Sequence, residues 1–331
     1  MKVCIVGAGA IGGLIGTRLA AAGQCELSAL ARGATLQALR THGWRLQTEN
    51  RLIQAPARAS SNPADLGEQD LVVIAVKGPA MTGIAQDIGP LLSPQTMVMP
   101  AMNGVPWWFS EGTPEISGRP LRSVDPGGAI SRAIPLRHAI GCVVHASAAA
   151  TEPGLVQHRV GQGLIIGEPS GTESVRIARL RDLLSHAGFE VTVSPRIRHD
   201  IWFKLWGNLT MNPVSALTGA TADRILDDPL VRAFCSAAMA EAAAIGTRIG
   251  CVITQSPEDR HAITRKLGAF KTSMLQDAES GKAIELDAIV AVVREIGQRL
   301  RIATPNIDAL LGLTRLFARV RGLYPVPEEA S

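Results

Sequence analysis

A glycine-rich run near the start of the chain constrains the fold more than any other feature. Residues 7–12 read Gly-Ala-Gly-Ala-Ile-Gly, between an apolar strand-like run at 2–6 and a helical pattern at 11–22 that Gly23 ends. In such a unit the glycines allow a tight turn and admit a pyrophosphate, and the helix N-terminus presents N–H groups to the phosphates. The run predicts a dinucleotide site, with a glycine-rich packing turn as the alternative. The residues expected to hold the cofactor here are Gly7, Ala8, Gly9, Ala10, Ile11 and Gly12.

Short apolar runs alternate with helical patterns over the first 195 residues. The run at 71–76 is continuously apolar, as expected where helices cover both faces of a sheet. This alternation predicts an α/β domain over 1–195 with a Rossmann-type doubly wound parallel sheet. The other expected strands lie at 26–31, 97–100, 141–146, 155–160, 164–167 and 189–193, and the other expected helices at 34–41 and 173–187.

From about Ile197 the pattern becomes helical. Ser256-Pro257 and Thr304-Pro305 each place a hydroxyl residue before a proline, a combination typical of helix starts. We therefore expect an all-α C-terminal domain over 196–331. The Pro-rich tail after Tyr324 is expected to fray.

Composition and charge exclude several functional classes. Of the 331 residues, 46% are hydrophobic and 19% are charged, which is typical of a two-domain globular protein and not of a disordered chain or a coiled coil. The net charge is +4, and acidic and basic residues are interspersed. Because the chain has no basic stripe and no zinc-finger spacing, we expect no nucleic-acid partner.

The cysteines and the apolar segments indicate a soluble cytoplasmic protein. None of the five cysteines belongs to a C-x-x-C pair, which argues against a disulfide framework and against a zinc site. The sequence offers no ligand cluster for another metal, so we expect none. The most apolar long segment, 233–253, contains Glu241 and Arg248. We therefore expect it to form a buried helix of a soluble protein rather than a membrane span, and we expect no membrane partner.

The residue after the second expected strand distinguishes the two nicotinamide dinucleotides. A site for NAD(H) usually places an acidic residue there to bind the ribose hydroxyls. Here the strand at 26–31 ends in Arg32-Gly33, and a guanidinium pairs with a 2′-phosphate through charge-assisted hydrogen bonds. We therefore expect NADP(H), bound by Arg32, and the alternative is a solvated loop arginine.

Two polar residues follow the next strands of the expected sheet. Lys77 comes directly after the run at 71–76, and Asn103 comes after the run at 97–100. Ligands of doubly wound sheets bind beyond the carboxyl ends of the strands. Lys77 is therefore expected to reach the cofactor or the substrate, and Asn103 to contact both. Each residue could instead be only the polar end of a strand.

One apolar helix carries a narrow polar stripe. In the segment 201–213, Lys204, Asn208 and Asn212 are spaced at i, i+4 and i+8, which places them on one face of a helix. A buried helix must satisfy such groups against something polar, and a ligand cleft would do so. The alternative is a surface pair of Lys204 with Asp200. Pro213 is expected to kink or end the helix.

Two further polar residues, Glu285 and Ser273, do not indicate a function when each is taken alone. Glu285 begins an expected helix at 283–300, where an acidic residue in the first turn often only complements the helix dipole. Ser273 precedes it by twelve positions. Taken together with the stripe and the glycine-rich run, however, the pattern resembles the ketopantoate reductases (2-dehydropantoate 2-reductases) over nearly the whole chain. The elements of the resemblance are the G-x-G-x-x-G run, Val76-Lys77, Asn103-Gly104, Lys204-x3-Asn208-x3-Asn212-Pro213, Ser273 and Glu285.

The resemblance implies a Rossmann domain followed by a helical domain, with catalysis in the cleft between them. It implies that NADPH delivers a hydride to the ketone carbon of ketopantoate, in pantothenate and coenzyme A biosynthesis. Lys204 would be the general acid and Glu285 would hydrogen-bond the new hydroxyl. The implied substrate-binding residues are Asn103, Asn208, Asn212 and Ser273, and the implied cofactor contacts beyond the glycine-rich run are Arg32, Lys77 and Asn103.

The chain departs from the family pattern in a long stretch between Asn103 and the expected strand at 141–146. It contains Trp107-Trp108-Phe109. These aromatic residues could narrow a substrate crevice and select a bulkier 2-keto acid, or they could only pack the stretch onto its domain. Two alternatives to ketopantoate reduction therefore stay open: a related 2-oxo-acid or 2-hydroxy-acid oxidoreductase, and a non-catalytic NADP(H)-binding regulator. A homodimer is a further possibility.

Overall fold

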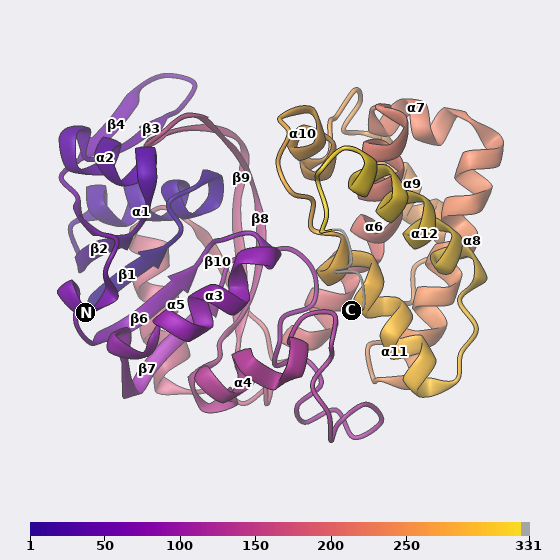
Figure 1. Ribbon diagram of the computed structural model, residues 1–331, viewed down its shortest axis with the longest axis horizontal. Coiled ribbons are helices and arrows are strands. Elements are labelled where there is room, and N and C mark those ends of the chain that lie inside the picture. The colour runs from indigo at the N-terminus through magenta and orange to yellow at the C-terminus, as the bar shows by residue number, and fades with distance from the viewer. Residues whose placement is uncertain (326–331) are drawn as a thin grey trace, which may run out of the picture. The chain divides into compact units, whose positions relative to one another are not determined.

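The computed structural model describes residues 1–325, and the chain divides into two compact units (Figure 1). Unit 1 comprises Met1–Met102 and Gly128–Asp200, and unit 2 comprises Asn103–Gly127 and Ile201–Ser331. The sequence-based boundary near residue 195 did not anticipate that 103–127 belongs with the helical unit. The tail expected to fray lies largely in residues 326–331, outside the described residues.

Unit 1 contains a parallel sheet with the strand order β5-β2-β1-β6-β7. The register pairs Val3 with Leu27 on one side and with Leu71 on the other, so β1 lies in the middle. This is the doubly wound sheet that the alternation predicted, and its carboxyl edge is where ligands bind in such sheets. The strands are β1 (Lys2–Val6), β2 (Glu26–Leu30), β5 (Arg58–Ser60), β6 (Gln69–Ile74) and β7 (Leu92–Pro100).

A second, mixed sheet completes unit 1, in the order β10-β9-β3-β4 with β8 paired antiparallel to β9. The runs at 155–160 and 164–167 were expected as two strands but form one strand, β9, because β8 pairs along its whole length with register shifts. The short strands β3, β4 and β5 were not predicted. The strands of this sheet are β3 (Trp44–Gln47), β4 (Leu52–Ala55), β8 (Gly141–Glu152), β9 (Leu155–Gly167) and β10 (Glu190–Val193).

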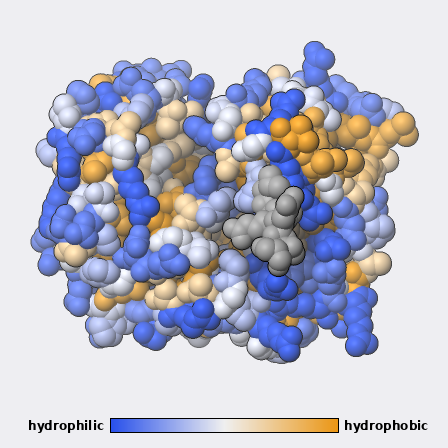
Figure 2. Space-filling model, in the orientation of Figure 1, coloured by the Kyte–Doolittle hydropathy of each residue, from blue (hydrophilic) through white to orange (hydrophobic). Residues whose placement is uncertain are grey.

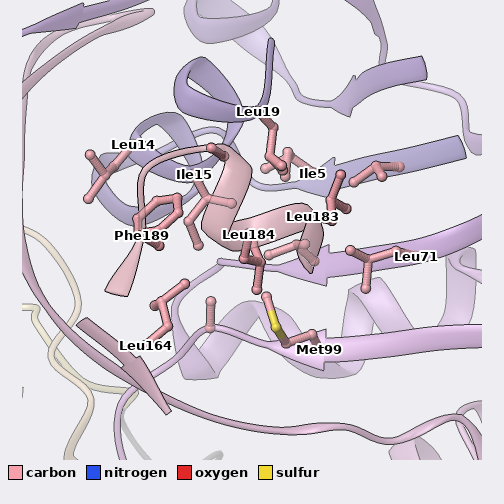
Figure 3. Packing of buried hydrophobic residues seen from close by; sticks show 14 of the residues in the cluster. Ile5, Leu14, Ile15, Leu19, Leu71, Met99, Leu164, Leu183, Leu184 and Phe189 are labelled. Atoms are coloured by element: carbon pink, nitrogen blue, oxygen red, sulfur yellow. The ribbon is translucent and has the colours of Figure 1, made fainter. Parts of the chain in front are cut away.

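The first helix, α1 (Ala10–Ala22), is apolar on most of its surface because it contacts both sheets. Gly16 lets it approach the second sheet, since a Cβ atom there would lie 2.4 Å from the Trp44 ring. Figure 3 shows Leu14, Ile15 and Leu19 of α1 within the core of unit 1. The remaining helices of this unit are α2 (Gly33–His42), α3 (Met81–Asp87), α4 (Ala129–Ala133) and α5 (Val175–His186), with 3-10 turns η1 (Pro63–Asp65), η2 (Gly78–Ala80), η3 (Gly89–Leu91) and η5 (Leu136–His138).

Unit 2 is helical, as the sequence predicted. Its longest helix, α6 (Ile197–Thr218), starts in unit 1 and continues five residues past Pro213. Pro213 therefore does not end the helix, and the buried Met211, Val214 and Ala216 around it supply the packing that offsets one lost backbone bond. The other helices are α7 (Ala222–Asp227), α8 (Pro229–Arg248), α9 (Pro257–Arg265), α10 (Ser273–Glu279), α11 (Val292–Leu300) and α12 (Pro305–Val320), with the 3-10 turn η4 (Pro126–Gly128) at the unit boundary.

One turn of π-helix, η6 (Asp287–Ala291), leads directly into α11. The helix expected at 283–300 therefore begins later than the sequence suggested, and Glu285 lies in the irregular segment just before it. In this segment Lys282 donates its N–H to the carbonyl of Asp277 at 2.9 Å, and Ile284 donates its N–H to the carbonyl of Leu323 at 3.1 Å.

The helix α8 is, by length and composition, apolar enough to span a membrane. Its Glu241 carboxylate accepts hydrogen bonds from the N–H groups of Asn306 and Ile307 at the start of α12. It packs one face in unit 2, through residues that include Cys235, Met239 and Ile245, and it is not buried all round. Figure 2 shows further apolar residues at the surface over α12 and neighbouring helices, and the exposed ones on α12 are Leu313, Leu316 and Val320.

The aromatic stretch at 107–109 packs inside unit 2. Trp107, Trp108 and Phe109 are all buried, with Trp108 and Phe109 at 0% exposure. The Phe109 ring stacks on that of Trp202 in α6, with centroids 6.0 Å apart and an interplanar angle of 25°. The stretch therefore serves to pack 103–127 onto the helices, and it gives no support to a lid that selects bulkier substrates.

Candidate active site

The three glycines of the first turn have three different surroundings. Gly7 has φ +90, and a Cβ atom on it would lie 2.6 Å from Cγ1 of Val76, two residues beyond β6. A Cβ atom on Gly12 would lie 2.0 Å from the carbonyl oxygen of Gly7, so α1 touches the turn. Gly9, the N-cap of α1, has no atom within 4 Å of such a Cβ and no side-chain cap. Open space at a helix N-terminus fits the pyrophosphate of a dinucleotide.

Arg32 and Lys77 both follow strands of the same parallel sheet. Arg32 is the N-cap of α2, two residues beyond β2, and Gly7 donates its N–H to Leu30 at the end of that strand. Lys77 is the N-cap of η2, three residues beyond β6, and is half-buried. The glycine turn, Arg32 and Lys77 therefore share the carboxyl edge of the sheet of unit 1.

The Arg32 guanidinium contacts a carboxylate. Its Nη2 atom lies 2.8 Å from Oδ2 of Asp87 at the end of α3, and the two side chains are 67% and 49% exposed. An ion pair this exposed contributes little to stability. The arginine can therefore exchange Asp87 for another anion at small cost.

In unit 2, Lys204 and Asn103 are in direct contact. Nζ of Lys204, on α6, donates a hydrogen bond to Oδ1 of Asn103 at 3.1 Å. Asp200, the alternative partner considered for Lys204, accepts a hydrogen bond from the hydroxyl of Ser194. The fold thus brings together Asn103, predicted from its place after a strand, and Lys204, predicted from the polar stripe of a helix.

The backbone after Asn103 is fixed on the π-turn. Val105 donates its N–H to the carbonyl of Ala288 in η6 at 2.9 Å. Gly104 has φ +86, and a Cβ atom on it would lie 2.2 Å from the same carbonyl oxygen. Single π-turns often occur at functional sites. Here the turn ties the Asn103 loop to the segment that carries Glu285, three residues before Ala288.

The remaining predicted residues, Glu285, Asn208, Asn212 and Ser273, also belong to unit 2. Glu285 is buried, with 7% exposure. Asn208 and Asn212 follow Lys204 along α6, and Asn212 is only 5% exposed. Asn208 is half-buried, and neither amide is among the fully buried polar groups that lack a partner within residues 1–325. Ser273 is exposed at the first turn of α10, where the neighbouring Thr272 is the N-cap.

Sequence reasoning missed a carboxylate–guanidinium pair that holds 103–127 in place. Oε1 and Oε2 of Glu295, on α11, accept the N–H groups of Arg122 and Ser123, each at 2.8 Å. Arg299, one turn further on, donates to Oε1 of Glu295 at 2.7 Å and to the carbonyls of Ile116 and Arg119. The i, i+4 spacing of Glu295 and Arg299 was visible in the sequence, but it reads equally well as an exposed helix pair.

The comparisons with known proteins cover both units. The family model described as "Ketopantoate reductase PanE/ApbA" matches residues 3–171, and the one described as "Ketopantoate reductase PanE/ApbA C terminal" matches residues 196–318. A 2-dehydropantoate 2-reductase of Mesorhizobium japonicum is 43% identical over 325 residues, covering 98% of this chain and 100% of the relative.

Solved structures agree with this match. A protein of known structure from Ralstonia solanacearum MolK2 is 57% identical with a TM-score of 0.94, covering 98% of this chain and 99% of that one. A PanE/ApbA family ketopantoate reductase from Ralstonia eutropha JMP134 is 28% identical with a TM-score of 0.81, covering 97% and 100%. The chain therefore belongs to the ketopantoate reductase family of oxidoreductases.

Proposed function

We propose that this protein reduces 2-dehydropantoate (ketopantoate) to (R)-pantoate with NADPH. The observation that carries the proposal is the 3.1 Å hydrogen bond from Lys204 to Asn103 in a member of this family. The 43% identical relative, which bears the name of this reaction and is covered over its full length, supports the same activity.

The residues of unit 1 fit a nicotinamide dinucleotide. The open space over Gly9 would take the pyrophosphate, and Gly7, Ala8, Ala10, Ile11 and Gly12 form the rest of that turn. Arg32 would bind the 2′-phosphate, since no acidic residue occupies the end of β2 and the pair with Asp87 is exposed. Lys77 would bind the cofactor from the end of β6. When bound, NADPH supplies the hydride.

The residues of unit 2 fit the protonation of the ketone oxygen that accompanies hydride transfer. Hydride addition to a ketone leaves negative charge on its oxygen, and Lys204 would donate a proton to that atom as general acid. An ammonium has three N–H donors, and the bond to Asn103 fixes the orientation of the group. The buried Glu285 would accept a hydrogen bond from the new hydroxyl.

Three further residues would bind the substrate. Asn208 and Asn212 follow Lys204 on α6 by one and two turns, and their amides can donate to and accept from a keto acid. Ser273 is an exposed residue, and its hydroxyl would bind the substrate carboxylate. Asn103 would contact both substrate and cofactor. We infer that a Rossmann domain over 1–195 binds the cofactor and that a helical domain over 196–331, joined by 103–127, binds the substrate.

The biological setting is inferred from the same family. Ketopantoate reduction belongs to pantothenate and coenzyme A biosynthesis, which we expect to take place in the cytoplasm, without a nucleic-acid or membrane partner. We expect no resident metal, and within residues 1–325 no group of three His, Cys, Asp or Glu side chains could hold one. The exposed apolar residues of α12 support a homodimer.

The proposal is tested by assaying the purified protein with ketopantoate and either NADPH or NADH. We expect NADPH oxidation with formation of (R)-pantoate, identified by chiral mass-spectrometric analysis, and slower turnover with NADH. A panel of bulkier 2-keto acids serves as the comparison. Faster turnover of another acid than of ketopantoate contradicts the substrate assignment, and cofactor binding without turnover of any acid would indicate a regulator.

A further inference from the structure

The residues after α12 cross over to the segment that carries Glu285. Gly322, with φ +67, ends the helix, and Leu323 follows with its N–H bonded to the carbonyl of Ala318 at 2.7 Å. The Leu323 carbonyl then accepts the N–H of Ile284 at 3.1 Å. Leu323 and Ile284 are both buried, at 3% and 1% exposure. One contact therefore reaches the residue directly before Glu285.

A second contact reaches the residue two positions after Glu285. The hydroxyl of Tyr324 donates a hydrogen bond of 2.5 Å to Oδ1 of Asp287, the first residue of the π-turn. Burial raises the pKa of the Asp287 carboxyl, although Tyr324, Arg315 and Arg319 act against this effect. Burial and the Asp287 carboxylate together raise the pKa of Tyr324, so the phenol keeps its proton and remains a donor.

Two consecutive residues thus hold Glu285 from both sides. The π-turn that begins at Asp287 also carries the Ala288 carbonyl, which accepts the Val105 N–H and so fixes the loop of Asn103. A displacement of Asp287 would therefore move Glu285 and, through Ala288, the partner of Lys204.

We propose that Tyr324 is a positioning residue: its hydroxyl, by holding Asp287, sets the place of Glu285 relative to the Lys204–Asn103 pair. The inference rests on the proposed function, because it assigns Glu285 and Lys204 to the keto-acid reaction. It adds that residues 323–324, through their bonds to Ile284 and Asp287 on either side of Glu285, control the rate of that reaction.

The test uses the full-length protein and the variant Tyr324→Phe. Phenylalanine keeps the ring beneath Arg319, whose Cζ lies 5.7 Å from the ring centroid, and removes only the hydroxyl. We expect kcat to fall about tenfold, as for one lost hydrogen bond to a charged group, with KM for ketopantoate changed less than kcat. Asp287→Ala should behave in the same way, and Asp287→Asn, which keeps an acceptor oxygen, should recover most of the lost rate.

A matched control separates positioning from general loss of stability. Thr314 is buried on α12, and its hydroxyl bonds the carbonyl of Leu310 at 2.7 Å, away from the contacts of Tyr324. Thr314→Val removes a buried hydroxyl from the same helix, so its kcat should stay within twofold of the parent. A kcat within twofold of the parent in Tyr324→Phe, or an equal loss in both variants, overturns the inference.

Two measurements test the contacts without turnover. The chain has one tyrosine, so protein labelled with 3-fluorotyrosine gives a single ¹⁹F resonance, which should move in Asp287→Ala. Hydrogen exchange of the Ile284 amide should be about tenfold faster in Tyr324→Phe and unchanged in Thr314→Val. An unmoved resonance or unchanged exchange overturns the inference, whereas an inactive parent with accelerated exchange overturns only the proposed function.

Discussion

Nζ of Lys204 lies 3.1 Å from Oδ1 of Asn103, although the two residues are 101 positions apart in the chain. The neutral amide oxygen accepts a hydrogen bond from one N–H of the ammonium, so it orients the group without neutralising its charge. An oriented cation in a partly buried site suits a proton donor to a developing oxyanion.

Replacement of this lysine should abolish most of the turnover. In Lys204→Ala we expect kcat to fall about 10³-fold, within the usual range for loss of a general acid, while the dissociation constant for NADPH stays within twofold. Single-turnover kinetics and a fluorescence titration of NADPH measure the two quantities. A loss of less than tenfold would show that another group donates the proton.

Sequence patterns predicted those parts of the site that neighbouring residues in the chain form by themselves. The sequence placed the first strand at 2–6 and the first helix at 11–22, and β1 and α1 occupy 2–6 and 10–22. The strand, turn and helix are adjacent in the chain, so periodicity and glycine positions suffice to describe them. The stripe of Lys204, Asn208 and Asn212 was visible for the same reason, because i+4 spacing is a property of one helix.

Contacts between distant segments could not be predicted in this way. The association of 103–127 with the helical unit depends on bonds such as that from Ser123 to Glu295, which spans 172 positions and has no sequence period. Near the start of the helix after Glu285, the bond from Tyr324 to Asp287 spans 37 positions and likewise has no sequence period. The continuation of α6 past Pro213 depends on packing around it, which outweighs a local preference.

The glycine turn allows a paired test in which one variant affects binding and the other affects folding. In Gly9→Ala the added methyl group meets no atom within 4 Å, so we expect the melting temperature to stay within about 1 °C of the parent value. We expect NADPH affinity to fall about tenfold, because the methyl group occupies the space expected for the pyrophosphate. In Gly12→Ala the new Cβ atom would lie 2.0 Å from the Gly7 carbonyl oxygen.

That overlap forces α1 away from its strand, and we expect a loss of about 2 kcal/mol in the free energy of unfolding. Differential scanning calorimetry and an NADPH titration of both variants measure these effects. An NADPH affinity of Gly9→Ala equal to that of the parent would show that the pyrophosphate does not bind over Gly9.

Coenzyme preference should depend on Arg32. Because its ion pair with Asp87 is exposed, Arg32→Ala should leave stability nearly unchanged, while the ratio of kcat/KM for NADPH to that for NADH falls at least about tenfold, as for a lost contact to phosphate. Asp87→Ala is the matched control: it frees the guanidinium, so the preference for NADPH should be kept or increased. An unchanged ratio in Arg32→Ala would remove the assignment of the 2′-phosphate to this residue.

The Glu295 carboxylate should make stability depend on pH. Burial alone would raise its pKa, but hydrogen bonds from the Ser123 N–H and hydroxyl, from the Arg122 N–H and from Arg299 outweigh burial and lower the pKa. A lowered pKa in the folded state stabilises the protein above the ordinary carboxyl value, and this contribution is lost as the pH falls through the lowered value.

Glu295→Gln should therefore cost about 2 kcal/mol at pH 7, and the difference from the parent should shrink below about pH 4. Four of the five tryptophans, Trp107, Trp108, Trp202 and Trp206, belong to unit 2, so urea unfolding followed by tryptophan fluorescence reports on the unit that contains Glu295. Glu279→Gln, which removes half of an exposed pair with Lys271, is the control and should change stability by less than about 0.5 kcal/mol. Equal losses in Glu295→Gln at pH 7 and at acid pH would show that packing, and not the charge of the carboxylate, holds 103–127 against α11.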